Sequence, residues 1–116
     1  MKNYIKFSLF ILFIILALTA CEEETTLMIK NESSRNPSSI EWNNISFGRN
    51  VVRGTNVTKT VTPGTGFIYL NNKTYRTQEL FTITKGEKAE FVLLDSTIVV
   101  RLTTFETGTW VSQPGN

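Results

Sequence analysis

Apolar residues are distributed in two different ways along this 116-residue chain. Residues 7–20 form one apolar run that only Ser8 and Thr19 interrupt. Beyond this run, apolar residues occur in short stretches separated by Asn, Gly, Pro and Asp, without a sustained helical i, i+3, i+4, i+7 pattern. The first part is typical of a targeting segment, and the rest predicts short β-strands.

The chain after residue 20 predicts an all-β domain. It contains sixteen threonines and a single alanine, Ala89, a composition that favours strands over helices. Seven to nine short antiparallel strands are typical of an immunoglobulin-like β-sandwich, and a small β-barrel is the alternative. We expect strands over residues 26–31, 39–43, 44–48, 56–62, 66–70, 77–84, 88–94 and 97–103, with a further strand over 108–112.

Asn43-Asn44 predicts a two-residue hairpin turn, because Asn tolerates the positive φ that a type I′ turn requires. In this register apolar residues face apolar ones on one side, and polar residues face each other on the other side. The expected pairs are Trp42 with Ile45, Ile40 with Phe47, and Glu41 with Ser46.

Asp95-Ser96 predicts a second two-residue hairpin, which would join strands 88–94 and 97–103. Both faces are apolar near the turn, so the hairpin would be central and buried. The expected pairs are Leu93 with Ile98, Phe91 with Val100, Val92 with Val99, and Glu90 with Arg101.

Two further turns and a core follow from the same pattern. A three-residue loop within residues 84–87 would align Phe81 with Phe91 and Ile83 with Ala89, and Pro63-Gly64 marks another turn. The side chains expected to point inward are Ile40, Trp42, Phe67 or Ile68, Phe81, Phe91, Leu93, Val100 and Leu102.

The N-terminal segment predicts a signal peptide. Lys2 and Lys6 precede the apolar run, and no acidic residue accompanies them. A fourteen-residue helix spans about 21 Å, whereas the hydrocarbon core of a bilayer is about 30 Å thick. A cleaved signal peptide over residues 1–20 therefore fits better than a permanent transmembrane helix.

The end of this segment, Leu18-Thr19-Ala20-Cys21, resembles the lipobox of bacterial lipoproteins. The resemblance implies that Leu18, Thr19 and Ala20 are recognised by a dedicated signal peptidase. It also implies that Cys21, the sole cysteine, becomes an N-acylated S-diacylglycerol cysteine. Two or three acyl chains on one residue would anchor the protein to a membrane, which a single chain does not achieve.

These boundaries predict three parts: a cleaved signal peptide (1–20), a lipidated tether (21–26) and a β domain (27–116). A fully extended tether of five residues after Cys21 reaches about 17 Å, so the domain would sit close to the lipid surface. Without residues 1–20 the chain carries ten basic and ten acidic residues. This zero net charge gives no support to nucleic-acid binding.

The residue inventory excludes several chemistries. The chain has no histidine, one cysteine and one aspartate, Asp95. Histidine-dependent catalysis, Cys/His zinc sites and intrachain disulfides are therefore excluded. We expect a protein that is not an enzyme and that needs no metal and no cofactor.

The richest polar and aromatic stretch contains Tyr75, Arg76 and Glu79, which we interpret as candidate surface contacts. The leading hypothesis is a membrane-anchored envelope lipoprotein with a non-enzymatic binding or surface-coat role. Its partner is the membrane, through the lipid, and a protein or glycan of unknown identity. The alternative is a carbohydrate- or small-ligand-binding module held at the membrane. Exposed aromatic residues such as Trp110 or Tyr69 would favour that alternative.

Spaced motifs over most of the mature chain resemble a group of small spirochaete-type lipoproteins. The resemblance supports the predicted location and implies no activity. The motifs are Asn31-Glu32-Ser33-Ser34, Trp42, Phe47-Gly48, Gly66-Phe67-Ile68-Tyr69, Arg76-Thr77 with Glu79, Lys85-Gly86-Glu87, and Asp95 with Thr97 and Val99-Val100.

Overall fold

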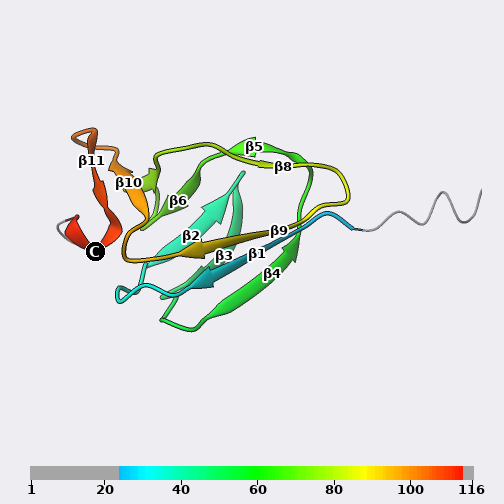
Figure 1. Cartoon of the computed structure of the whole chain (residues 1–116), viewed down its shortest axis with the longest axis horizontal. Coiled ribbons are helices and arrows are strands. Elements are labelled where there is room, and N and C mark those ends of the chain that lie inside the picture. Colours follow the sequence, from blue (N-terminus) through cyan, green and yellow to red (C-terminus); the bar gives the residue numbers. More distant parts are fainter. Residues whose placement is uncertain (1–23, 114–116) are drawn as a thin grey trace, which may run out of the picture.

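The structure, a computed structural model, describes residues 24–113. Within this range eleven short strands form three sheets, and one 3₁₀ helix lies near the end (Figure 1). The prediction of an all-β domain is confirmed, with more strands than expected and with sheets that do not close into a barrel. The predicted signal peptide and the lipobox residues Leu18, Thr19, Ala20 and Cys21 lie outside the described residues.

The sheets differ in size and in strand direction. The largest has the order β11-β10-β7-β6-β2-β3, with bounds Glu106–Thr109, Ile98–Arg101, Tyr75–Thr77, Ile68–Leu70, Ser39–Trp42 and Ile45–Arg49. The second has the order β4-β1-β9, with bounds Asn56–Thr60, Thr26–Asn31 and Lys88–Leu93. The third pairs β5 (Gly64–Gly66) with β8 (Phe81–Ile83), and the 3₁₀ helix η1 covers Trp110–Ser112.

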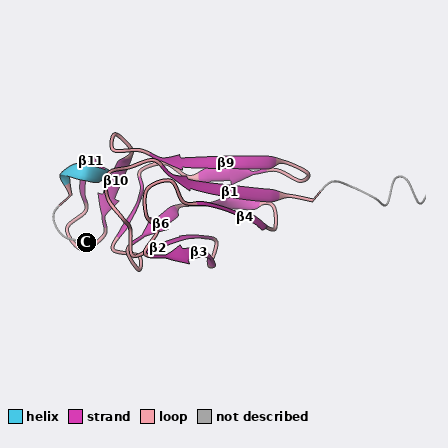
Figure 2. Ribbon diagram, turned by 90° about the horizontal axis from the view of Figure 1, so that it is seen from below, coloured by secondary structure: helices cyan, strands magenta, loops and turns pink. Residues whose placement is uncertain are grey.

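The core lies between two layers. Figure 2 shows β1, β4 and β9 on one side of the domain and β2 and β3 on the other. Strand β1 alternates between half-buried and buried residues, so Leu27 and Ile29 point inward from the first layer. Ile40 and Trp42 point inward from the second layer and are completely buried. This arrangement is a small β-sandwich.

The Asn43-Asn44 hairpin is confirmed near its turn. The φ angles of Asn43 and Asn44 are 46° and 64°, Trp42 pairs with Ile45, and Glu41 pairs with Ser46. The expected pair of Ile40 and Phe47 is wrong, because the register shifts by one residue so that Ser39 pairs with Arg49. Gly48, with φ 130°, lies in this β-bulge, where few other residue types would be tolerated.

The Asp95-Ser96 hairpin is wrong, although a turn is present. The N–H of Thr97 donates to Leu94 O at 3.1 Å, as in a β-turn. Strand β9 then pairs in parallel with β1, whereas β10 pairs with β7 and β11 in the other layer. None of the expected ladder pairs between strands 88–94 and 97–103 is formed.

The other two turns lie where the sequence places them. The chain bends at Pro63 before β5 begins, and Glu87 N donates to Thr84 O at 3.1 Å around Gly86, whose φ is 76°. The expected ladder between β8 and β9 is wrong, because β8 pairs with β5. Phe81 and Phe91 still meet as an edge-to-face ring pair with centroids 6.0 Å apart.

Most of the expected core residues are confirmed. Ile68, not Phe67, points inward, and Leu93 and Val100 are buried. Phe81, Phe91 and Leu102 are only half-buried. The two phenylalanines line an opening between the sheets.

Candidate functional site

The structure separates the three residues proposed as surface contacts. Tyr75 is 1% exposed, so its assignment as a surface contact is wrong. Its ring packs edge-to-face against Trp110 with centroids 5.5 Å apart. Arg76 is half-buried on the opposite face of the same strand, and Glu79 is exposed. Neighbouring side chains of a strand point to opposite faces, so Tyr75 and Arg76 could not have shared a surface.

An apolar pocket lies where the chain crosses between sheets. The predicted strand over 77–84 is split into β7 and β8, and residues 78–80 carry the chain from one sheet to the other. The pocket at this crossing has a volume of about 340 Å³. Its lining residues come from β6, the β7–β8 crossing, β9 and the start of β10: Ile68, Thr77, Gln78, Glu79, Leu80, Phe81, Phe91, Thr97 and Ile98.

The mouth of the pocket carries two exposed apolar side chains. Leu80 is 57% exposed and Ile98 is 43% exposed. Inside, the Phe81–Phe91 pair and the buried Ile68 form an apolar wall. Clustered exposed apolar side chains beside a concave surface are typical of a binding site.

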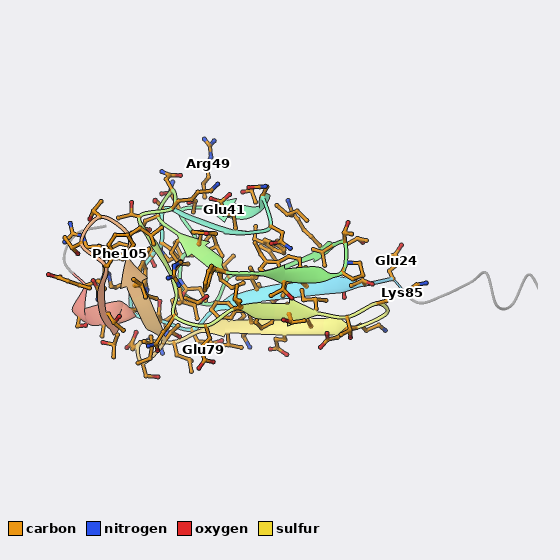
Figure 3. The ribbon with its side chains drawn as sticks, turned by 90° about the horizontal axis from the view of Figure 1, so that it is seen from above. Glu24, Glu41, Arg49, Glu79, Lys85 and Phe105 are labelled. Atoms are coloured by element: carbon orange, nitrogen blue, oxygen red, sulfur yellow. The ribbon has the colours of Figure 1, made fainter. Side chains whose placement is uncertain are left out.

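The polar part of the rim is held by three hydrogen bonds. The hydroxyl of Thr77 donates to Glu79 O at 2.9 Å and accepts from Ile68 N at 3.2 Å. Gln78 N donates to Ile98 O at 3.2 Å. These contacts fix the backbone of the crossing, while the Glu79 side chain remains exposed at the mouth. Figure 3 shows Glu79 on the side of the molecule opposite to Glu41 and Arg49.

A second aromatic surface lies on the solvent side of β6 and β7. Phe67 and Tyr69 are half-buried and meet edge-to-face at 6.3 Å between centroids. The guanidinium of Arg76 lies 3.9 Å from the centroid of Phe67, and Lys73 Nζ lies 5.7 Å from that of Tyr69. Both cations therefore stack on aromatic rings, an arrangement that cation–π attraction stabilises.

Trp110 has a structural role. It is completely buried, and its indole N–H donates to Ser33 Oγ at 3.2 Å. Arg35 covers the ring at 4.5 Å and donates through Nη1 to Trp110 O at 2.6 Å and to Gln113 O at 2.7 Å. Trp110 therefore fixes the last described turn and contributes no exposed aromatic surface.

Asp95 links the turn after β9 to the loop after β1. Its Oδ1 accepts from Ser34 N at 2.6 Å and from Ser34 Oγ at 3.0 Å. The backbone hydrogen bond from Ser34 is the main cause that lowers the pKa of Asp95 below its ordinary value, with smaller help from the Ser34 hydroxyl and from Arg53. Asp95 is an exposed residue, and its carboxylate serves to position the turn.

Residues 24–113 contain neither a cluster of metal ligands nor a membrane-spanning helix. No group of three or more Cys, Asp or Glu side chains is placed to hold a metal ion in residues 24–113. No helix in that part of the chain is long and apolar enough to cross a membrane.

Comparison with known proteins adds no relative: no family model, no curated protein and no solved structure matches the chain. The resemblance to small spirochaete-type lipoproteins therefore stays a prediction from the sequence.

Sequence reasoning missed most of the pocket. It named Glu79 but not Leu80, Ile98 or Thr97. One signal was available: Leu80 is a lone apolar residue among the polar positions Gln78, Thr82 and Thr84 of the predicted strand. This residue breaks the alternation of the polar face, and it lies where the predicted strand is split into β7 and β8.

Proposed function

We propose that this chain is a lipid-anchored protein of a bacterial cell envelope whose β domain has a non-enzymatic binding role. The apolar pocket with exposed Leu80 and Ile98 is the observation that supports binding most strongly. The Leu18–Cys21 sequence supports the anchor. Strand β1 starts at Thr26, which agrees with a short tether between Cys21 and the folded domain.

The anchor is tested by the variant Cys21→Ser, which removes the thiol that accepts the diacylglyceryl group. We expect it to lose incorporation of an alkyne-palmitate label and to leave the membrane fraction. Thr19→Ser, which keeps a small residue beside the cleavage site, is the matched control and should retain both properties. A Cys21→Ser protein that still takes up the label would contradict the proposal.

A carbohydrate-binding module is the second candidate, supported by Phe67, which precedes β6, and by Tyr69 and Arg76 on β6 and β7. Trp110 is buried and no longer contributes to this candidate. If sugars bind here, Tyr69→Ala should weaken binding to soluble peptidoglycan fragments. The control variant Phe105→Ala should leave this binding unchanged. Phe105 is 75% exposed and lies at the end of the domain opposite to Glu24 and Lys85 (Figure 3).

A further inference from the structure

The outer edge of β9 is an open strand edge. β1 lies between β4 and β9, and it donates from Thr26 N to Glu87 O at 3.0 Å and from Glu32 N to Leu93 O at 2.9 Å. In a parallel ladder, alternate residues of a strand bond to the neighbour on one side. The odd-numbered residues of β9 therefore bond to β1, and the N–H and C=O groups of Lys88, Glu90 and Val92 point to the other side.

No described strand pairs with this outer edge. Strand β8, which precedes β9 in the chain, pairs instead with β5. Figure 1 shows β8 and β9 diverging from the turn that joins them. The apolar pocket lies on this side of β9, and Phe91 is the β9 residue that lines it.

The pocket and the strand edge fit one kind of ligand. A strand added along β9 would direct every second side chain to the inner face, where Phe91 points. A side chain placed opposite Phe91 would enter the pocket beside Phe81 and Leu80. Backbone hydrogen bonds would provide affinity and the pocket would select the side chain, as in β-strand addition.

We propose that the outer edge of β9 binds an extended peptide segment of another protein as an added strand, with an apolar side chain in the pocket. This inference rests on the proposed binding function and names its ligand class. A peptide fits better than an acyl chain, because backbone amides would pair with the open N–H and C=O groups, whereas an acyl chain would displace water from them without replacing its hydrogen bonds.

The charges around the edge define the partner further. Glu79 at the pocket mouth and Glu90 on the outer face of β9 are both exposed carboxylates. A basic residue next to the apolar anchor would complement these two carboxylates. The preferred segment therefore alternates apolar residues with polar or basic ones.

The test uses the lipidated protein in phosphatidylcholine vesicles and a short fluorescent peptide in which Val and Phe alternate with Thr and Lys. We expect saturable binding by anisotropy above that to protein-free vesicles. N-methylation of alternate peptide amides on the pairing side should weaken binding about tenfold or more, because it removes hydrogen bonds without removing side chains.

Variants of the protein test the same edge. Glu90→Pro removes an N–H that bonds to no other strand, so it should weaken binding by about tenfold while the fold persists. Glu90→Gln removes the charge but keeps the backbone N–H, so it should weaken binding less than Glu90→Pro. The matched control is Thr58→Pro on the open edge of β4. Asn31 N bonds to Thr55 O and Val61 N to Thr25 O, so the N–H of Thr58 also points away from β1.

Equal binding of the N-methylated and unmodified peptides would overturn strand addition, as would an equal loss in Glu90→Pro and Thr58→Pro. Saturable binding of a fluorescent fatty acid without peptide binding would overturn it too, but would leave the proposed binding function standing. Membrane retention of Cys21→Ser would contradict the anchor and would not bear on β9.

Discussion

Two turns that the sequence predicts as two-residue hairpin loops, Asn43-Asn44 and Asp95-Ser96, have different outcomes in this domain: two residues join β2 to β3, whereas four residues, 94–97, join β9 to β10. The first closes a hairpin between β2 and β3, and the second sends β9 and β10 into different sheets. Both asparagines have positive φ, whereas neither Asp95 nor Ser96 does. Type I′ turns require positive φ at both positions, and only the first turn meets this requirement and joins its two strands as a hairpin.

Contacts outside each turn reinforce the difference. The side chain of Asn43 lies against Gly66, where an added Cβ would overlap with it. Asp95 is held instead by the N–H and hydroxyl of Ser34, which follows β1. The two-residue pattern predicts that the chain turns. The sign of φ and the contacts with distant residues decide with which strand the following one pairs.

Truncation to alanine of the residue before each turn should give the largest difference between the two turns in the free energy of unfolding. Trp42 is completely buried and its indole N–H donates to Gly66 O and Phe81 O. Trp42→Ala should lower the free energy of unfolding by about 3–5 kcal/mol. Leu94→Ala, at a residue 45% exposed before the second turn, should cost less than about 0.5 kcal/mol. Urea denaturation of both variants measures this, and similar losses would contradict the assigned burial.

Glycine substitutions should have opposite effects in the two turns. Asn44→Gly should raise the free energy of unfolding by about 0.5 kcal/mol, because glycine adopts positive φ without a steric cost. Ser96→Gly should lower it by about 0.5–1 kcal/mol, because it adds freedom to the unfolded chain at a residue with ordinary φ. Thermal denaturation would detect both shifts, and a stabilising Ser96→Gly would indicate a type I′ turn there.

The smallest expected effect is the pH dependence from Asp95. Its pKa is lowered in the folded state relative to its ordinary value of 3.8. The stabilisation is therefore fully present above that value and is lost as the pH falls through the folded pKa. Asp95→Asn should make the melting temperature less dependent on pH below about pH 5. An unchanged pH profile would show that Ser34 does not hold the carboxylate.

Local structure was predictable where it depends on neighbouring residues. The bounds of β1 follow from the alternation that buries Leu27 and Ile29, and all four predicted turns occur near their expected positions. Strand partners were less predictable. The alternation of apolar residues predicted that Phe81 and Phe91 pair in one ladder, but the two rings make this contact between different sheets. A hydrophobic pattern reports that two side chains need apolar neighbours, and it does not report in which sheet they find them.

The candidate site was predicted only at its rim. Composition drew attention to residues 75–79, and Glu79 does lie at the pocket mouth. Tyr75 was misplaced because an aromatic residue beside polar ones was interpreted as exposed, whereas Trp110 completes its packing from the other end of the chain. The pocket itself depends on the separation of β8 from β9, which no local pattern encodes.

The Asp95-Ser96 turn separates β9 from β10 and leaves the outer edge of β9 open. Amide hydrogen exchange along β9, resolved by NMR, tests this arrangement. Slow exchange at Ala89, Phe91 and Leu93 with fast exchange at Lys88, Glu90 and Val92 is the predicted result. Protection of all six amides, with a nuclear Overhauser contact between Glu90 and Arg101, would show that β9 and β10 form a hairpin and would contradict the account.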